Sequence, residues 1–244
     1  MPTTNLKSRI LYPLEFESKV LGKEIYKFSI ENYNHLPDLK TELSKLNRCY
    51  VVTQVESSQS QIINELLRLG FKLMGFPLFL ENKIIPSVDS IPSDKIRFAD
   101  LNDLDQLLEI TKGSFFNVHW YKEHGVFNKS TIDEIYLQWV RNSLSGRADK
   151  ILVFEEANKI QGYLAANYYP TEKLAKIDLL CVSENKRGLG IGKELVRAFV
   201  SHYSKTCSLL QVKTEGDNYP ALKAYNSCGF YSKTLSVNLN LLIS

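Results

Sequence analysis

Three glycines separated by single residues, Gly188, Gly190 and Gly192, follow Arg187 where a predicted strand gives way to a predicted helix. Glycine has no Cβ, so the backbone amides of such a turn can approach a ligand closely. Amides at a helix N-terminus, together with the positive end of the helix dipole, favour a phosphate group. Arg187 adds positive charge, and the segment therefore predicts a site for a phosphate-bearing ligand.

Two common phosphate motifs do not fit this spacing. A dinucleotide motif, G-x-G-x-x-G, needs its third glycine where Lys193 stands. A P-loop, G-x-x-x-x-G-K-[ST], needs a glycine at Arg187 and a Ser or Thr at Glu194. The alternative that needs no ligand is a glycine-rich turn that only packs a helix against a strand.

A second set of residues lies downstream, where Asn218 is followed seven residues later by Tyr225. Pro220 suits the first turn of a short helix and Gly229 its C′ position. A phenol with a pKa of about 10 can donate a proton to the leaving group of a reaction. Taken alone, Tyr225 fits equally well as a core aromatic with a satisfied hydroxyl.

Both segments resemble the GNAT superfamily of N-acetyltransferases, whose pyrophosphate loop reads Q/R-x-x-G-x-G/A and whose short helix carries Tyr between an Asn and a Gly-Phe pair. The resemblance implies an α/β (α+β, mixed-sheet) acetyltransferase fold, acetyl-CoA as co-substrate and no metal. It also implies that Tyr225 protonates the thiolate of CoA. The cofactor-binding positions that it implies are Leu180, Cys181, Val182, Arg187, Gly188, Leu189, Gly190, Ile191, Gly192 and Asn218.

The reaction needs further groups, because negative charge develops on the thioester oxygen and the attacking amine must lose a proton. Backbone amides near residues 180–182 can stabilise the oxyanion. Asp178, in the same predicted strand, is a candidate base, and ordered water is the alternative. His119 and His124 fall in a segment without periodicity, where a surface or packing role is more usual.

For the acceptor, the chain resembles the dTDP-4-amino-4,6-dideoxygalactose (TDP-fucosamine) N-acetyltransferase family in residues 12–22, 66–73 and 114–146. It departs where Val20-Leu21 replaces two phenylalanines, in its complete glycine loop, and in the Phe that follows Gly229. The likeness implies a nucleotide-linked amino sugar as acceptor, in surface polysaccharide or lipopolysaccharide biosynthesis. The aromatics that could stack on thymine, or else form core, are Phe115, Phe116, Trp120 and Tyr121.

Two alternatives remain open at this point. The acceptor could be a protein N-terminus, a lysine or a polyamine, although the acidic run 100–105 fits helix capping better than amine binding. The chain could instead be a non-catalytic acyl-CoA-binding module, against which the presence of both Asn218 and Tyr225 argues.

The elements that must position these groups alternate along the chain. We expect strands over residues 48–53, 71–80, 96–98, 151–154, 160–169, 176–182, 209–214 and 233–242, and helices over residues 60–69, 132–144, 190–203 and 220–227, with a further helix capped by Asn102 or Asp103. Residues 85–94 contain two prolines and three serines and predict a linker. We therefore expect a smaller N-terminal α/β domain over residues 1–88 and the acetyltransferase domain over residues 95–244. A degenerate copy of the acetyltransferase fold is one interpretation of the smaller domain. Both halves contain strand–helix–strand units, which is a weak sign of an internal repeat.

Composition narrows the partners and the compartment. Lys and Arg number 30 against 27 Asp and Glu, without a long basic block, so nucleic acid gains no support as a partner. No secretory signal or membrane-spanning apolar run is present, and the four cysteines form no C-x-x-C pair. We expect a cytoplasmic protein with no membrane partner; a homodimer is compatible with the sequence, which does not determine the oligomeric state.

Overall fold

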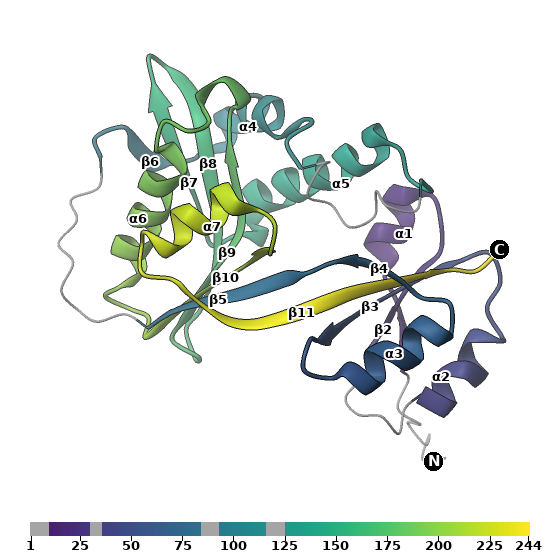
Figure 1. Cartoon of the computed structure of the whole chain (residues 1–244). Helices are drawn as coiled ribbons and strands as arrows, with labels where there is room; N and C mark the ends of the chain where they lie inside the picture. Colours follow the sequence, from purple (N-terminus) through teal and green to yellow (C-terminus); the bar gives the residue numbers. More distant parts are fainter. Residues whose placement is uncertain (1–9, 30–35, 84–92, 116–124) are drawn as a thin grey trace, which may run out of the picture. The chain divides into compact units, whose positions relative to one another are not determined.

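The computed structural model describes residues 10–29, 36–83, 93–115 and 125–244 (Figure 1). The chain forms two compact units, one of Met1–Phe76 with Leu235–Ser244 and one of Pro77–Thr234. These units divide the chain differently from the predicted domains, because residues 77–83 join the second unit and the chain's last ten residues join the first. Most of the predicted linker lies outside the described residues.

The second unit contains a mixed sheet in which the strands follow the order β5-β10-β9-β8-β7-β6. These strands are β5 (Pro77–Lys83), β6 (Ile96–Phe98), β7 (Lys150–Glu156), β8 (Lys159–Tyr169), β9 (Leu174–Val182) and β10 (Leu209–Glu215). Neighbouring strands are antiparallel except β9 and β10, which are parallel. The predicted α/β class with a mixed sheet is confirmed.

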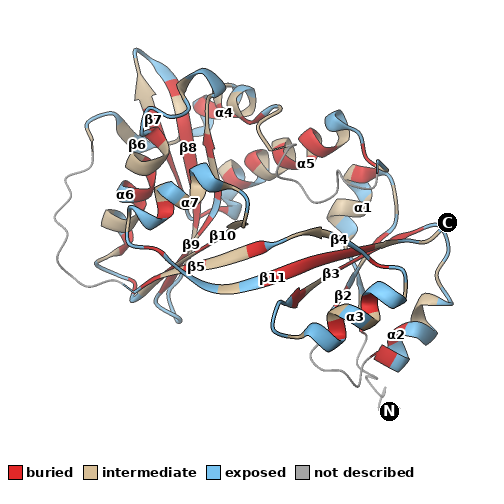
Figure 2. Ribbon diagram, viewed as in Figure 1, coloured by how far each residue is buried: buried red, intermediate tan, exposed pale blue. Residues whose placement is uncertain are grey.

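Helices cover both faces of this sheet. Successive side chains of β8 point to opposite faces, and apolar residues on each face pack against a helix. The Tyr163 hydroxyl hydrogen-bonds to that of Thr111, at the end of α4 (Leu104–Thr111), over 2.8 Å. The next residue, Leu164, packs on the opposite face with Leu195 and Phe199 of α6 (Ile191–Tyr203). Figure 2 shows β8 buried along much of its length, and Figure 1 shows α6 and α7 on the near side of the sheet.

Local capping sets the limits of the remaining helices of this unit. The Asn128 side chain accepts a hydrogen bond from the amide of Thr131 at 2.9 Å, so α5 (Lys129–Asn142) begins three residues before the predicted start. A π-helical turn, Ser143–Arg147, follows, and inside it Gly146 has a φ angle of 105° that breaks the helical geometry. The short helix α7 (Tyr219–Asn226) begins at its N-cap Asn218, close to the prediction.

The first unit has its own sheet, in the order β1-β2-β3-β11 with β4 also paired to β11. Its strands are β1 (Leu11–Pro13), β2 (Ile25–Phe28), β3 (Tyr50–Glu56), β4 (Lys72–Gly75) and the end of β11 (Tyr231–Leu242). Its helices are α1 (Glu15–Leu21), α2 (Leu36–Leu43) and α3 (Ser60–Arg68). Strands β2 and β3 are parallel, and the core includes Phe28, Leu39 and Leu66. The predicted strand over residues 71–80 is in fact two strands, β4 and β5, one in each unit.

Candidate active site

Two parallel strands separate in the second unit and leave a cavity between their ends. Pairing of β9 with β10 runs from Leu174 and Leu209 to Ile177 and Val212 and then stops, although β9 continues for five residues and β10 for three. The cavity measures about 350 Å³. Its lining includes residues 177–180, residues 212–215, Asn218 and Tyr225 on one side, and Phe115, Tyr136, Trp139, Ser143 and Arg147 on the other.

Asp178 enters this cavity through an irregularity of the sheet. Leu179 pairs with Ala165 and Ile177 with Ala166, which makes Asp178 the extra residue of a β-bulge. Burial raises the pKa of Asp178, and this rise is partly opposed by Arg147, whose Nη2 lies 3.8 Å from its Oδ2, and by a hydrogen bond from the amide of Asn167. The carboxyl is therefore a stronger base than an ordinary aspartate.

The amide of Leu180 faces the open edge of β9. The amide of Ser183 donates to the carbonyl of Gln161 on β8 at 2.9 Å. Because amides along an antiparallel strand alternate between its two edges, the amide of Cys181 also points to β8 and that of Leu180 points away, where β10 no longer pairs. The Cys181 thiol is buried as well, donates to the carbonyl of Ile110, and has its pKa raised to about 11 by burial. Of these two predicted residues, Leu180 is the one that reaches the cavity.

Tyr225 and Asn218 line the cavity from α7 and its N-cap. Tyr225 is 4% exposed, and burial raises the pKa of its phenol far above the usual value. Its hydroxyl makes no hydrogen bond within the described part of the chain. Asn218 does not cap its helix with its side chain, whose amide instead donates to the Thr214 hydroxyl at 3.1 Å. Both predicted residues are thus next to the separated strands.

The glycine loop opens helix α6 just after β9. Gly188 and Gly190 have φ angles of 81° and 87°, which residues with a Cβ rarely adopt, and Gly190 is the N-cap. The amides that follow, from Ile191 onward, have no partner within the first turn of the helix. The Ile191 side chain is buried in the core, so only its backbone is available to a ligand. By contrast Leu189 is 68% exposed.

Arg187 is held at the end of β9. Its Nε donates to the carbonyl of Val182 at 3.2 Å, and its Nη2 donates to the hydroxyl of Ser114 at 3.1 Å. The contact uses the carbonyl of Val182, which is the third strand-end residue predicted to bind the cofactor. The guanidinium therefore ties the glycine loop to the segment that follows α4.

Aromatic rings form the opposite side of the cavity. The rings of Phe115 and Tyr136 are stacked with centroids 4.3 Å apart, and Trp139 meets Tyr136 edge-on at 5.0 Å. The guanidinium of Arg147 lies 5.9 Å from the Trp139 ring. Phe115 was among the predicted acceptor-side aromatics, whereas Phe116, Trp120, Tyr121, His119 and His124 lie outside the described residues.

Sequence reasoning missed the cavity residues Glu215 and Arg147, and it missed Asn167, whose side-chain amide donates to the Asp178 carboxylate. Glu215 is the last residue of a strand predicted to stop one residue earlier, and the other two have no motif around them. The only usable signal was position, since side chains at the carboxyl ends of parallel strands meet at one edge of a sheet.

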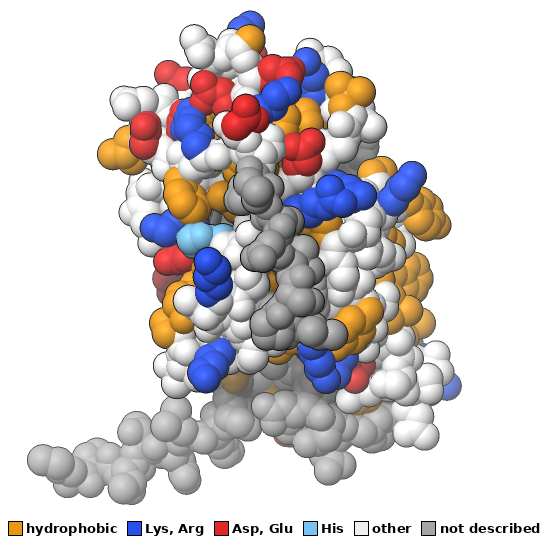
Figure 3. Space-filling view, turned by 90° about the vertical axis from the view of Figure 1, so that its left-hand side faces the viewer, with side chains coloured by type: hydrophobic (Ala, Val, Ile, Leu, Met, Phe, Trp, Pro, Cys, Tyr) orange, Lys and Arg blue, Asp and Glu red, His pale blue; other side chains and the backbone are white. Residues whose placement is uncertain are grey.

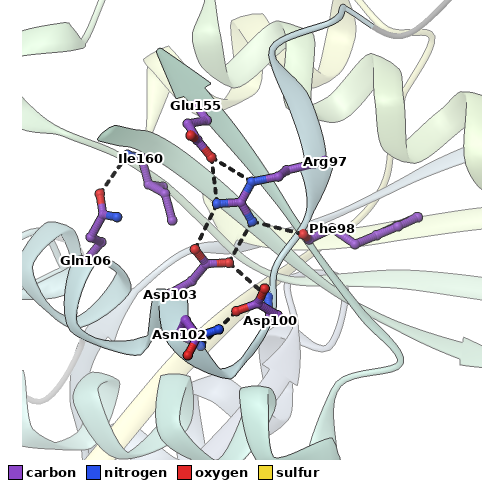
Figure 4. Close-up of polar contacts among 8 residues, drawn as sticks. All are labelled: Arg97, Phe98, Asp100, Asn102, Asp103, Gln106, Glu155 and Ile160. Atoms are coloured by element: carbon purple, nitrogen blue, oxygen red, sulfur yellow. Dashed lines mark hydrogen bonds and ion pairs between the residues drawn. The ribbon is translucent and has the colours of Figure 1, made fainter. Parts of the chain in front are cut away.

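The acidic run 100–105 is structural, as Figure 4 shows. Arg97 donates to both carboxylate oxygens of Asp103, at 2.7 and 2.8 Å, and the amide of Asp100 donates to the same carboxylate at 2.9 Å. The Asp100 side chain in turn accepts from the amide of Asn102, which completes a capping box. These contacts lower the pKa of Asp103, mainly through the Arg97 hydrogen bonds.

Charges elsewhere on this unit are mixed in sign. In Figure 3, acidic and basic side chains are intermingled on the upper part of the face that is shown. Lys95 and Lys186 both pair with Glu156, at 2.6 and 3.3 Å. Among the described residues no group of three or more His, Cys, Asp or Glu could hold a metal ion, and none of the described helices has both the length and the apolarity to cross a membrane.

Comparison with known proteins assigns this arrangement. The family model described as the acetyltransferase (GNAT) family matches residues 104–230, just over half of the chain. The chain belongs to the GNAT family. It is an acetyl-CoA-dependent N-acetyltransferase. The matched segment contains the separated strands, the glycine loop and α7.

No curated protein matches this GNAT chain in sequence. Among solved structures it is similar to a GCN5-related N-acetyltransferase from Sphaerobacter thermophilus, with a TM-score of 0.67 and 12% identity over 95% of this chain and 76% of that one. It is also similar to a functionally unknown conserved protein from Staphylococcus epidermidis, with a TM-score of 0.61 and 14% identity over 93% and 89%. An acetyltransferase from the GNAT family of Colwellia psychrerythraea gives a TM-score of 0.57 and 15% identity over 88% and 76%. Identities this low show a shared fold and nothing finer.

Proposed function

We propose that the cavity between β9 and β10 is where an acceptor amine attacks the thioester of acetyl-CoA. The observation that carries this proposal is that pairing of the two strands stops at Ile177 and Val212, which leaves the Leu180 amide and Tyr225 at one cavity. In the proposal, the diphosphate of the cofactor binds the amides of the loop from Gly188 to Gly192, with Arg187 and Asn218 as further contacts. The thioester carbonyl then accepts from the amide of Leu180, which stabilises the oxyanion.

Tyr225 is the proposed acid of this reaction. The amine nitrogen bonds to the carbonyl carbon, the carbon–sulfur bond breaks, and the phenol gives its proton to the departing thiolate of CoA. Because burial raises the pKa of Tyr225, the phenol stays protonated until the thiolate forms. Because its pKa is raised, the phenolate takes a proton back from water once the product leaves.

Asp178 is the proposed base, with ordered water as the alternative. Its carboxylate lines the same cavity, and burial raises its pKa, which makes it a stronger base than an ordinary aspartate. If water serves instead, Asp178→Asn should leave the pH dependence of kcat/KM unchanged.

For the acceptor we propose the amino group of a nucleotide-linked (dTDP) amino-dideoxy sugar. Support comes from the likeness to TDP-fucosamine N-acetyltransferases in residues 12–22, 66–73 and 114–146. It also comes from the aromatic wall of Phe115, Tyr136 and Trp139, on which a base or a sugar ring can stack. A thiol-release assay against 3-amino and 4-amino sugars linked to a nucleotide tests this. If thiol release with every sugar of that panel stays at the background rate, the proposal of a nucleotide-linked amino sugar as acceptor is refuted.

A second acceptor class, a small cationic amine or a lysine side chain, is favoured by one observation. Two carboxylates, Asp178 and Glu215, line the cavity and could bind a second ammonium group. Polyamines and lysine peptides therefore belong in the same panel. A KM for polyamines that rises steeply with salt would select this class, because ion pairs at a half-open site are screened.

The reaction itself is tested by Tyr225→Phe, with acetyl-CoA binding measured by calorimetry and turnover by thiol release. We expect an unchanged Kd and a kcat lower by about 10²–10⁴-fold, the usual contribution of general acid catalysis. An unchanged kcat would remove Tyr225 from the mechanism. Binding of acetyl-CoA without turnover of any amine would instead favour a non-catalytic acyl-CoA-binding module.

A further inference from the structure

The two units repeat one segment at a constant separation. Gly229-Phe230 follows Gly70-Phe71 by 159 residues (229 − 70), and in each case the pair ends a short helix that follows a strand. The hydrogen bonds that close the two helices also correspond. The amide of Phe71 donates to Leu66 O at 3.0 Å, and that of Phe230 donates to Tyr225 O at 3.2 Å.

The strand pairings repeat at the same separation but are exchanged. In the second unit, β10 pairs with β5 from Leu209 with Lys83 to Glu215 with Pro77. In the first unit, β3 pairs with β11 from Tyr50 with Leu242 to Glu56 with Ser236. Adding 159 to Tyr50 and Glu56 gives Leu209 and Glu215, and adding 159 to Lys83 and Pro77 gives Leu242 and Ser236, so the two registers match with their partners interchanged. Strand β5 follows the first unit's helix α3 and strand β4 in the chain but joins the sheet of the second unit, and β11 follows the second unit's helix α7 but joins the sheet of the first.

We propose that the chain is a tandem repeat of one half-fold whose copies exchange their last strands, and that the strand received by the catalytic copy carries Asn82, a positioning residue for Tyr225. The second part rests on the proposed function of Tyr225.

One pair of equivalent contacts supports the repeat and marks where the copies differ. A Cβ at the left-handed Gly70 would lie 3.6 Å from Leu241 Cδ1, and one at the left-handed Gly229 would lie 3.1 Å from Asn82 Nδ2. Leu241 and Asn82 are again separated by 159 residues. The first unit therefore places an apolar side chain on this turn, where the second places an amide.

The first copy also lacks the reactive groups. Leu66, fully buried, stands where the second copy has Tyr225, and Gln59 stands where it has Asn218. Residues 29–35, between its parallel strand β2 and helix α2, contain no glycine. The reactive groups are thus confined to the second copy, and the exchanged strand places the amide of Asn82 in the same compact unit as the phenol of Tyr225.

Asn82 acts on the end of the helix that carries Tyr225. Its Nδ2 donates to the carbonyl of Cys228 at 2.9 Å, in the turn that follows the C-cap Ser227 of the helix. The side chain is 9% exposed and also covers Gly229. Phe230, next in the chain, contacts the Tyr225 ring with centroids 5.8 Å apart. A shift of this turn therefore moves the phenol.

The test is Asn82→Leu, which installs the side chain that the first copy uses in the equivalent contact and so preserves packing. We expect kcat to fall at least tenfold, with the Kd for acetyl-CoA unchanged within threefold. Asn82→Asp, isosteric but unable to donate when ionised, should behave in the same way if the leucine variant does not fold. The matched control is Leu241→Ala in the first unit, which should lower Tm and leave kcat and KM unchanged.

A double-mutant cycle separates positioning from general stability. If Asn82 acts through the phenol, adding Asn82→Leu to Tyr225→Phe should not lower kcat further. An equal loss of kcat in both backgrounds, or no loss in Asn82→Leu alone while Tyr225→Phe is impaired, would overturn this inference and leave the proposed function standing. An unchanged kcat in Tyr225→Phe would overturn both.

Discussion

Gly192 is the one glycine of the loop that the fold itself does not require. Gly188 and Gly190 have positive φ angles, which explain their identity without a ligand. Gly192 lies in the first turn of α6, where a Cβ would meet Val182 Cγ2 at 3.8 Å and Leu180 Cδ2 at 4.0 Å, ordinary contact distances. A glycine in a helix costs up to about 1 kcal/mol relative to alanine. If the turn only packs a helix on a strand, nothing offsets that cost.

We therefore expect Gly192→Ala to change stability and binding in opposite directions. Relief of the glycine cost should raise the free energy of unfolding by about 0.5–1 kcal/mol, or Tm by about 2–4 °C for a unit of this size. The new methyl group would prevent the diphosphate from reaching the amides. Loss of one charge-assisted hydrogen bond, worth about 1.5–3 kcal/mol, weakens the Kd for acetyl-CoA by about 10- to 100-fold.

Scanning calorimetry without ligand measures the first effect, and titration calorimetry with acetyl-CoA measures the second. Gly190→Ala is the matched control, because its φ of 87° makes a Cβ costly by about 1–2 kcal/mol, so that both stability and affinity should fall. A Gly192→Ala protein that is more stable and binds acetyl-CoA with unchanged affinity would show that the glycine turn serves packing alone.

The remaining predictions concern two carboxylates and one core leucine. Because the folded pKa of Asp178 is raised, the folded state holds the carboxyl proton more tightly than the unfolded state does, and the free energy of unfolding falls as the pH rises from about 3.8 through the raised pKa. Asp178→Asn should therefore raise Tm at neutral pH. It should also lower kcat and remove the acidic limb of the pH profile of kcat/KM. The pKa of Asp103 is lowered, so its contribution to stability is present at neutral pH and is lost as the pH falls through that lowered value. Because solvent screens the half-exposed Arg97, Asp103→Asn should cost only about 1–2 kcal/mol by urea denaturation at pH 7, and less at pH 3. Leu239, fully buried near the C-terminus, belongs to the core of the first unit, so Leu239→Ala should cost about 2–5 kcal/mol in urea denaturation without changing the Kd for acetyl-CoA.

Local signals were enough to predict the elements of the second unit. The alternation of β8, the apolar face of α6 and the glycine stop before Phe230 all act within a few residues of chain, so most of these boundaries were predicted to within three residues. The feature of this unit that local signals did not predict is the bulge of β9 at Asp178, because it depends on the pairing of β9 with β8. For that reason the sequence could nominate Asp178 as a base without explaining how its side chain enters the cavity.

The first unit was predicted less completely because its elements are short and non-local. Strands β1 and β2 have three and four residues and helices α1 and α2 seven and eight, too few for a period to be distinguished. The predicted strand over residues 71–80 shows a different limit. Gly75 and Pro77 interrupt this otherwise strand-forming run, but a local break does not show that the chain passes from one unit to the other at Phe76–Pro77.

Exchange of equivalent strands also explains why the domain boundary predicted at the proline-rich segment 85–94 differs from the boundaries of the two compact units, at Phe76–Pro77 and Thr234–Leu235. A compositional linker marks where a chain lacks regular structure, whereas a compact unit is defined by which strands pair. Here the pairing of β5 with β10 brings Asn82 to a turn 146 residues further along the chain. No window of sequence contains both partners, and Asn82 alone reads as an ordinary strand residue. Its relation to Tyr225 becomes visible only when Leu241 is seen to make the corresponding contact on Gly70 in the copy that has no tyrosine to position.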